Sequence, residues 1–151
     1  MPRPQKKRSI LSPPRHSGFK PVGVTSRQLQ ALPLALDEFE AIRLADYQGL
    51  DHAESAEQME ISRSTFSRLV ERARQKVARF LIEGKHLQIE GGEIHFQGNL
   101  IKCRDCGHLL NLPFDSDLTG CPACGSSNLI DLADGYGHGH CCRRHHRRNR
   151  R

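Results

Sequence analysis

Residues 52–70 read HAESAEQMEISRSTFSRLV and have the pattern of two helices joined by a tight turn. Ala56 is small, as required where two helices cross closely, and the apolar residues after it recur where such a pair closes over a third helix. These apolar residues are Met59, Ile61, Phe66 and Leu69. Ser62 is the natural N-cap of the second helix, because its hydroxyl can accept hydrogen bonds from the first turn. The segment therefore predicts a helix-turn-helix.

The neighbouring sequence predicts the rest of a three-helix domain. Residues 36–48 (LDEFEAIRLADYQ) carry apolar side chains at helical spacing, and Gly49 is a good C-cap residue. We expect a second helix over about 53–59 and a third over about 63–83. The third has an apolar stripe made of Phe66, Leu69, Val70, Ala73, Val77, Phe80 and Leu81. Glu60 occupies the turn position that favours Gly, at a cost of about 1 kcal/mol for a left-handed backbone.

Charge divides sharply between these helices. Residues 37–60 carry eight acidic side chains and one basic one, whereas residues 63–79 carry six basic side chains and one acidic one. We therefore expect the third helix, residues 62–82, to enter the major groove of duplex DNA as a recognition helix. The candidate contacts to bases and phosphates are its polar residues that lie off the apolar stripe. They are Arg63, Ser64, Thr65, Ser67, Arg68 and Arg72.

The net charge of +6 also hides a difference between the chain ends and the middle. Residues 1–36 carry seven basic side chains and no acid, and residues 143–151 carry six arginines and no acid. Such arms favour binding to nucleic acid through counterion release. No apolar run reaches the ~20 residues of a membrane span, and no secretory signal follows the basic start. We expect a cytoplasmic protein with no membrane partner.

Two C-x-x-C-G turns follow, with Cys103 and Cys106 in the first and Cys121 and Cys124 in the second. Each turn can present two thiolates to one ion, and two such turns complete a tetrahedral shell. Four thiolates leave no open position for water, so we expect a structural zinc. Iron is the alternative, because paired C-x-x-C turns also hold a redox-active iron.

The last residues hold a second group of soft ligands, namely His138, His140, Cys141 and Cys142. One interpretation is a flexible basic tail that contains these residues by chance. The other is a solvent-open metal or redox sensor, because neighbouring thiols and imidazoles bind transition ions.

Together these patterns predict the fold class and five segments. We expect a mainly α N-terminal domain, then a β-hairpin, then a small zinc-ribbon-like β unit, and a disordered basic tail. In the hairpin, a turn at Gly91 and Gly92 would place Ile89 opposite Ile94 and Leu87 opposite Phe96. The segments are a basic extended arm (1–35), the helix-turn-helix domain (36–84), the hairpin (85–99), the four-cysteine zinc-ribbon-like unit (100–133) and the tail (134–151).

Several motifs carry a family resemblance. They are MPRP at the start, FKPVGV at 19–24, LDEFEAIRLADYQGL at 36–50, SRSTFSRLVERARQKVA at 62–78 and IEGG at 89–92. In this order they resemble the bacterial and archaeal family of predicted DNA-binding proteins called domain of unknown function one-three-four, over about residues 1–92. The helical part is also similar to region four of sigma factors, which reads promoter DNA. The resemblance implies a transcription regulator, and Glu60 departs from the family's Gly.

We therefore expect a DNA-binding regulator that contacts duplex DNA and the transcription machinery. The different class is an adaptor whose ribbon and arms bind RNA or a transcription or translation partner. A third alternative is a regulator that responds to metal or redox state through the tail. We expect no enzyme, because His95, Asp105 and Asp115 fall in no catalytic spacing. A homodimer on two half-sites would fit, although no sequence feature marks its interface.

Overall fold

The computed structural model describes residues 6–116 and 118–149, which divide into two compact units. The MPRP motif lies outside the described residues. The first unit runs to Ile10 and continues from His16 to Ile94, and the second comprises Leu11–Arg15 and the residues from His95 onward. The elements of the first unit are β1 (Arg8–Ile10), β2 (Gly18–Phe19), a short 3-10 helix η1 (Ser26–Gln28), β3 (Ala31–Leu34), α1 (Leu36–Ile42), a π-helical turn η2 (Arg43–Tyr47), α2 (His52–Met59), α3 (Arg63–Glu83) and β4 (His86–Ile89). Within the described residues, no helix combines the length and apolar character needed to cross a membrane.

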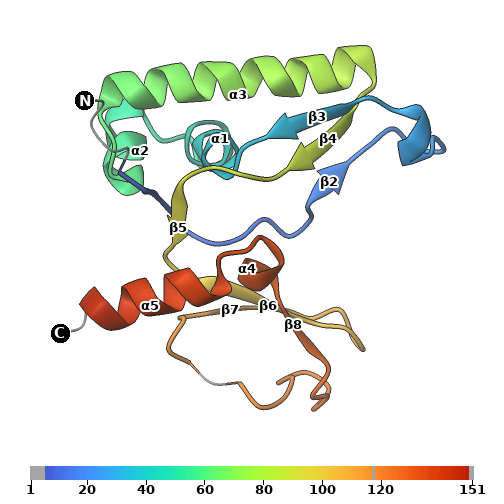
Figure 1. Cartoon of the computed structure of the whole chain (residues 1–151), viewed down its shortest axis with the longest axis vertical. Coiled ribbons are helices and arrows are strands. Elements are labelled where there is room, and N and C mark those ends of the chain that lie inside the picture. The colour runs from blue at the N-terminus through green and yellow to red at the C-terminus, as the bar shows by residue number, and fades with distance from the viewer. Residues whose placement is uncertain (1–5, 117, 150–151) are drawn as a thin grey trace. The chain divides into compact units, whose positions relative to one another are not determined.

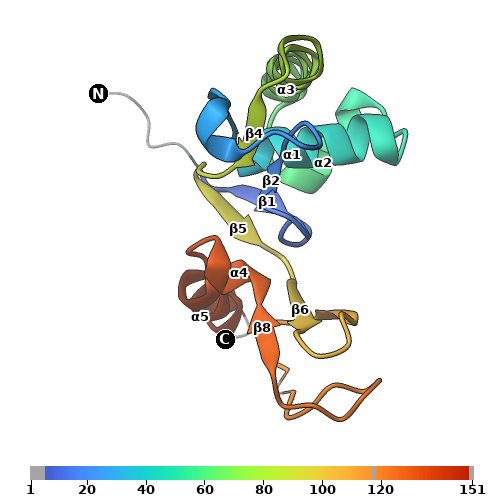
Figure 2. The same cartoon turned by 90° about the vertical axis from the view of Figure 1, so that its right-hand side faces the viewer.

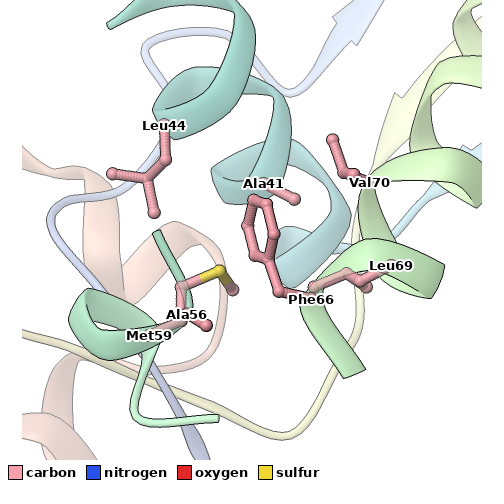
Figure 3. Packing of buried hydrophobic residues seen from close by; sticks show 7 residues of the cluster. All are labelled: Ala41, Leu44, Ala56, Met59, Phe66, Leu69 and Val70. Carbon is pink, nitrogen blue, oxygen red and sulfur yellow. The ribbon is translucent and has the colours of Figure 1, made fainter. Parts of the chain in front are cut away.

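The helices of the first unit lie where the periodicity predicts them. Figure 1 shows α3 running along the unit, with α1, β3 and β4 beneath it, and Figure 2 shows α3 nearly end-on with α1 and α2 beside it. Their shared core is drawn in Figure 3 and consists of Ala41, Leu44, Ala56, Met59, Phe66, Leu69 and Val70, each at most 3% exposed. Ile61 lies at the edge of this core. The small residue at position 56 thus sits in the packed centre, as predicted.

The predicted fold class is wrong, because the N-terminal part is not mainly α. Among the residues that the structure describes there are eight strands spread through the chain, so the protein is mixed α/β. A three-stranded sheet of order β2-β4-β3 belongs to the first unit. Its strands β2 and β3 lie in the segment that we expected to be an extended arm.

The β-hairpin prediction is also wrong. β4 pairs antiparallel with β2, where Phe19 faces Leu87, and parallel with β3, where Leu34 faces Ile89. β5 (Ile94–Phe96) instead pairs with β1. β4 pairs with β3 instead of β5 because β3 also carries apolar residues in alternation. Pro33 interrupts that pattern in the sequence, so β3 is not predicted. Proline is tolerated in β3 because it is an edge strand, where a backbone N–H is not needed.

Three acidic residues at the start of α1 are buried rather than solvated. Asp37 accepts a hydrogen bond from Arg8 at 2.5 Å, Glu38 pairs with Lys76 at 2.6 Å, and Glu40 pairs with Arg43. Glu38 also accepts a hydrogen bond from the N–H of Ala35 at 3.0 Å. Each buried carboxylate therefore has a cationic partner, as burial of charge requires.

The second unit is built on an antiparallel sheet of order β7-β6-β8. It contains β6 (Asn99–Cys103), β7 (Leu109–Leu112), β8 (Leu129–Asp131), α4 (Leu132–Gly135) and α5 (Gly139–Asn149). In the register, Ile101 faces Leu110 and Lys102 faces Ile130. Cys103 ends the central strand, and this position carries the first cysteine of the predicted metal centre.

The prediction of a disordered tail is also wrong, because α4 and α5 form in this segment (red in Figure 1). A shortage of aliphatic side chains is the feature of this segment that favours disorder. In the structure Cys142 is fully buried, and rings take the place of aliphatic contacts. The His138 ring packs edge-on against Phe96 with centroids 5.6 Å apart, and His146 stacks on Phe114 at 5.4 Å.

Candidate nucleic-acid interface and metal centre

The turn before α3 sets the direction of that helix. Glu60 adopts the left-handed conformation, with φ 57° and ψ 41°, at the position where the sequence analysis placed that strain. Ser62 then caps α3, and its Oγ accepts a hydrogen bond from the N–H of Thr65 at 3.2 Å. Both features are local, which is why the sequence could predict them.

The six predicted contact residues divide into two groups. Arg63, Ser64, Arg68 and Arg72 are exposed on the N-terminal half of α3. Within residues 6–116 and 118–149, the three guanidinium groups have no hydrogen-bond or ion-pair partner. The cations farther along α3 are different, because acidic residues hold them. Arg74 bonds Asp46 through two nitrogens at 3.1 and 2.8 Å, Lys76 pairs with Glu38, and Arg79 lies 3.5 Å from Glu83.

Thr65 and Ser67 form the second group and are engaged within the protein. The Thr65 hydroxyl lies 2.7 Å from the Ser62 hydroxyl. The Ser67 hydroxyl donates to the carbonyl of Arg63 at 3.0 Å and lies 2.8 Å from Nδ1 of His52 on α2. The His52 ring packs edge-on against Phe66, with centroids 5.4 Å apart. Ser67 therefore joins α3 to α2, and Thr65 belongs to the cap of α3.

A groove along α3 adds a residue that no sequence motif indicates. Its lining consists of Arg8, Thr65, Arg68, Glu71, Arg72 and Gln75. Arg8 comes from β1, and its contact with Asp37 places it beside the α3 arginines. The sequence indicated only that Arg8 belongs to a basic arm. Its place in the groove depends on strand pairing far from α3 in the chain.

The two cysteine turns of the second unit have the same backbone geometry. The carbonyl of Cys103 accepts from the N–H of Gly107 at 2.9 Å, and that of Cys121 accepts from Gly125 at 2.8 Å. The N–H of each of these cysteines donates to the residue five positions later, His108 or Ser126, at 2.9 and 2.8 Å. Gly107 and Gly125 have φ near +77° and +75°, which favours glycine. The repeated C-x-x-C-G motif thus forms the repeated turn that it predicts.

The four sulfur atoms converge on one point. All of them lie within 4.8 Å of one another, with Cys103 to Cys124 and Cys106 to Cys121 each at 3.6 Å. Zn–S bonds of about 2.3 Å in a tetrahedron place neighbouring sulfurs about 3.8 Å apart. The donor set and its spacing therefore fit a metal ion, and they are compatible with zinc.

Ionisation of these thiols points the same way. Burial raises the pKa of Cys121, but N–H groups of Cys124 and Ala123 and the neighbouring thiols outweigh burial and bring it to about 7. The N–H of Ser126 lowers the pKa of Cys124, but the other thiols, first that of Cys103, and burial raise it to about 12. Hydrogen bonds among the thiols thus favour the thiolate at Cys121 and the thiol at Cys124, and a bound cation would favour ionisation of all four.

Asp105 links the two cysteine turns. It accepts hydrogen bonds from the side chains of Ser126 and Asn128, the latter at 3.3 Å, while the N–H of Arg104 donates to the carbonyl of Asn128 at 2.9 Å. These contacts give Asp105 a structural place beside the metal centre.

The second predicted cluster lies at the start of α5. Cys142 is buried, Cys141 and His138 are half-buried, and His140 is exposed. The structure brings His95, at β5, to the two thiols and leaves both His138 and His140 outside the group of three. No local pattern indicates His95 as a partner of the thiols, because forty-five residues separate it from Cys141.

The fold and this site define a mixed α/β protein with an exposed basic helix and a four-cysteine group that could hold a metal. Residues 1–97 match the family described as "Protein of unknown function DUF134". The UPF0251 protein of Chloroherpeton thalassium is 50% identical over 132 residues, which is 87% of each chain. The UPF0251 protein of Moorella thermoacetica is 42% identical over 147 residues, which is 97% of this chain and 96% of the relative.

The chain therefore belongs to the DUF134 family, known also by the relatives' name UPF0251. This confirms the family suggested by the motifs of residues 1–92. The likeness extends farther than we expected, since the Moorella relative matches through the cysteine segment as well.

Proposed function

We propose that this protein binds duplex DNA through the N-terminal half of α3 and acts as a transcription regulator. One observation carries the proposal. Arg63, Arg68 and Arg72 are exposed and lack partners in the described part of the chain, whereas the cations farther along α3 are held by acids. A guanidinium that is already paired must give up its acid before it can bind a phosphate. The unpaired ones are ready to bind.

The positions of these arginines on α3 suggest different DNA contacts. Arg68 and Arg72 are four residues apart and share the groove with Arg8, so they suit successive phosphates or a guanine edge. Arg63 and Ser64 lie at the start of the helix, the end that contacts bases when such a helix enters the major groove. Thr65 and Ser67 fix α3 on its cap and on α2.

The acidic residues support the same orientation. Asp51, Glu54 and Glu57 are exposed on or beside α2, whereas Asp37 and Glu38 are buried under α3. Phosphates are repelled from the α2 surface and attracted to the N-terminal half of α3. The duplex is therefore expected to approach along the groove that contains Arg8.

We further propose that zinc occupies the Cys103, Cys106, Cys121 and Cys124 site. Four thiolates would fill the tetrahedral shell, so the ion would stabilise the fold of the second unit and take no part in a reaction. The thiolates and the backbone N–H groups of the two turns are what this chain supplies.

The test is selection of bound sequences from a random duplex pool at physiological salt, followed by a titration of the recovered site against scrambled DNA. We expect the site to bind at least ~10³-fold more tightly than scrambled duplex. The double variant Arg68→Ala/Arg72→Ala is expected to lose at least ~10-fold in affinity for the site.

Arg79→Ala is the matched control. It also removes one guanidinium from α3, but this guanidinium is already paired with Glu83. It should change affinity little. Two results would reject sequence-specific reading by α3 and favour the RNA or protein adaptor instead. One is an equal loss of affinity in the double variant and in Arg79→Ala, and the other is binding of scrambled DNA and of RNA as tightly as the selected site.

A further inference from the structure

We infer that the second unit holds a second metal site, for a thiophilic transition ion such as Zn²⁺, where His95 meets Cys141 and Cys142. A ligand atom of each residue lies within 4.8 Å of the others. Sγ of Cys142 is 3.9 Å from Nδ1 of His95 and 3.9 Å from Sγ of Cys141. These spans are close to the roughly 3.5–3.8 Å between ligands of one tetrahedral zinc.

The surroundings suit a thiolate at Cys142. This residue is fully buried, and the N–H of Phe96 donates to its sulfur at 3.2 Å. Hydrogen bonds to a sulfur stabilise the charged form that binds metal. A buried thiol with a backbone donor and two further soft ligands beside it is a metal-ligand environment rather than a core contact.

Two further histidines lie near this group: His145 orients the His95 ring, and His138 offers another nitrogen donor. The His95 ring stacks on His145, with centroids 4.2 Å apart and planes 11° from parallel, which limits its rotation. Nδ1 of His138 lies 3.4 Å from Sγ of Cys141. His138 lies outside the group of three, so a shift of its ring toward Cys142 and His95 would complete a shell of two thiolates and two imidazoles.

An ion at this site would have a different effect from an ion held by the four cysteines. Its ligands come from β5 and from the region of α5, so an ion would connect the two elements. His146 already joins them, because its Nε2 lies 3.0 Å from the carbonyl of Phe96. With three ligands grouped and the fourth at the rim, the ion is expected to exchange more readily than the one held by four cysteines. Occupancy would then report the level of the metal in the surroundings.

The experiment is a zinc titration of the full chain, stripped of metal and kept reduced, in competition with a chromophoric chelator. We expect two ions per chain. The first is held by the four cysteines, and the second, held by His95, Cys141 and Cys142, should be released to the chelator before the first. Cys141→Ser and His95→Ala should each weaken the second ion at least ~10-fold and leave the first unchanged. His140→Ala is the matched control, because this exposed histidine of the same segment lies outside the group, and it should bind two ions as before.

Cobalt substitution supplies a readout that does not depend on stability. The chain has six cysteines, and two of them belong to this site. The thiolate-to-cobalt absorption of Cys141→Ser/Cys142→Ser should therefore fall by about one third, with circular dichroism checking the fold. A single ion in the unaltered chain, or two ions of unchanged affinity in Cys141→Ser, would overturn the inference. Neither result bears on DNA binding by α3, which is tested separately.

Discussion

Nζ of Lys76 lies 2.6 Å from Oε1 of Glu38, and this ion pair joins the middle of α3 to the first turn of α1. The Glu38 side chain is only 6% exposed and that of Lys76 is 32% exposed. A carboxylate so deeply buried depends on its partners, since water cannot replace them. The pair therefore fixes how the helix with the candidate DNA contacts sits on the rest of the unit.

Lys76→Met tests that dependence. The methionine keeps the aliphatic stem but leaves Glu38 with the N–H of Ala35 alone, so we expect the free energy of unfolding to fall by about 2 kcal/mol. Urea denaturation measures it. Arg79→Met is the control, because the Arg79–Glu83 pair is about half exposed and should matter by less than about 0.5 kcal/mol. Equal changes in the two variants would show that Glu38 does not need Lys76.

Loss of the metal centre is expected to unfold only one unit. Cys121→Ser removes one ligand, and the remaining three thiols cannot complete the shell that links β6 to the loop before β8. Hydrogen exchange should then become fast over residues 99–131, while the amides of α3 stay protected by their own core. Ser127→Ala, in the same loop, should leave both regions as they are. Loss of protection throughout α3 would show that the two units do not fold independently.

Some of this architecture was open to prediction because its causes are local. The cap at Ser62, the left-handed residue at Glu60 and the spacing of the C-x-x-C-G turns each depend on a few neighbouring residues. Other parts depend on partners distant in the chain. β3 escaped notice because Pro33 opposes strand structure, and only its edge position beside β4 makes it acceptable.

The same contrast applies to the candidate sites. The spacing of the four cysteines was enough to group them, because each turn delivers two ligands at once. Arg8 and His95 could not be placed, since each reaches its site through strands whose pairing no local pattern reveals. The helix α5 was missed for a related reason. Its stability depends on ring contacts with Phe96 and Phe114 rather than on aliphatic burial.

Glu60→Gly should stabilise the protein. Glu60 has φ 57°, and among the described residues it is the single non-glycine with positive φ. Removing Cβ relieves the left-handed strain, so we expect the free energy of unfolding to rise by about 1 kcal/mol. Gln58→Gly is the matched control, because this exposed position lies within α2, where glycine should destabilise by about 1 kcal/mol. A lower stability for Glu60→Gly would mean that the glutamate side chain makes a favourable contribution larger than the backbone cost.

The pH dependence of the second unit is expected to include Tyr136. Burial raises its pKa to about 12 from the ordinary value of 10, and its hydroxyl donates to the carbonyl of Pro14 at 3.2 Å. The folded state therefore keeps this proton after the unfolded chain has lost it. The resulting stabilisation is fully present below pH 10, and stability falls as the pH rises from about 10 to 12.

Ultraviolet titration of phenolate formation can isolate this group, because the chain has only two tyrosines. In Tyr47→Phe, which alters an 85% exposed side chain, all remaining signal comes from Tyr136 and should appear near pH 12. Tyr136→Phe should abolish that late step and make stability less dependent on pH between 10 and 12. Ionisation of Tyr136 near pH 10 with the fold intact would mean that its ring is open to solvent, and the packing of α4 beside Phe96 would have to be revised.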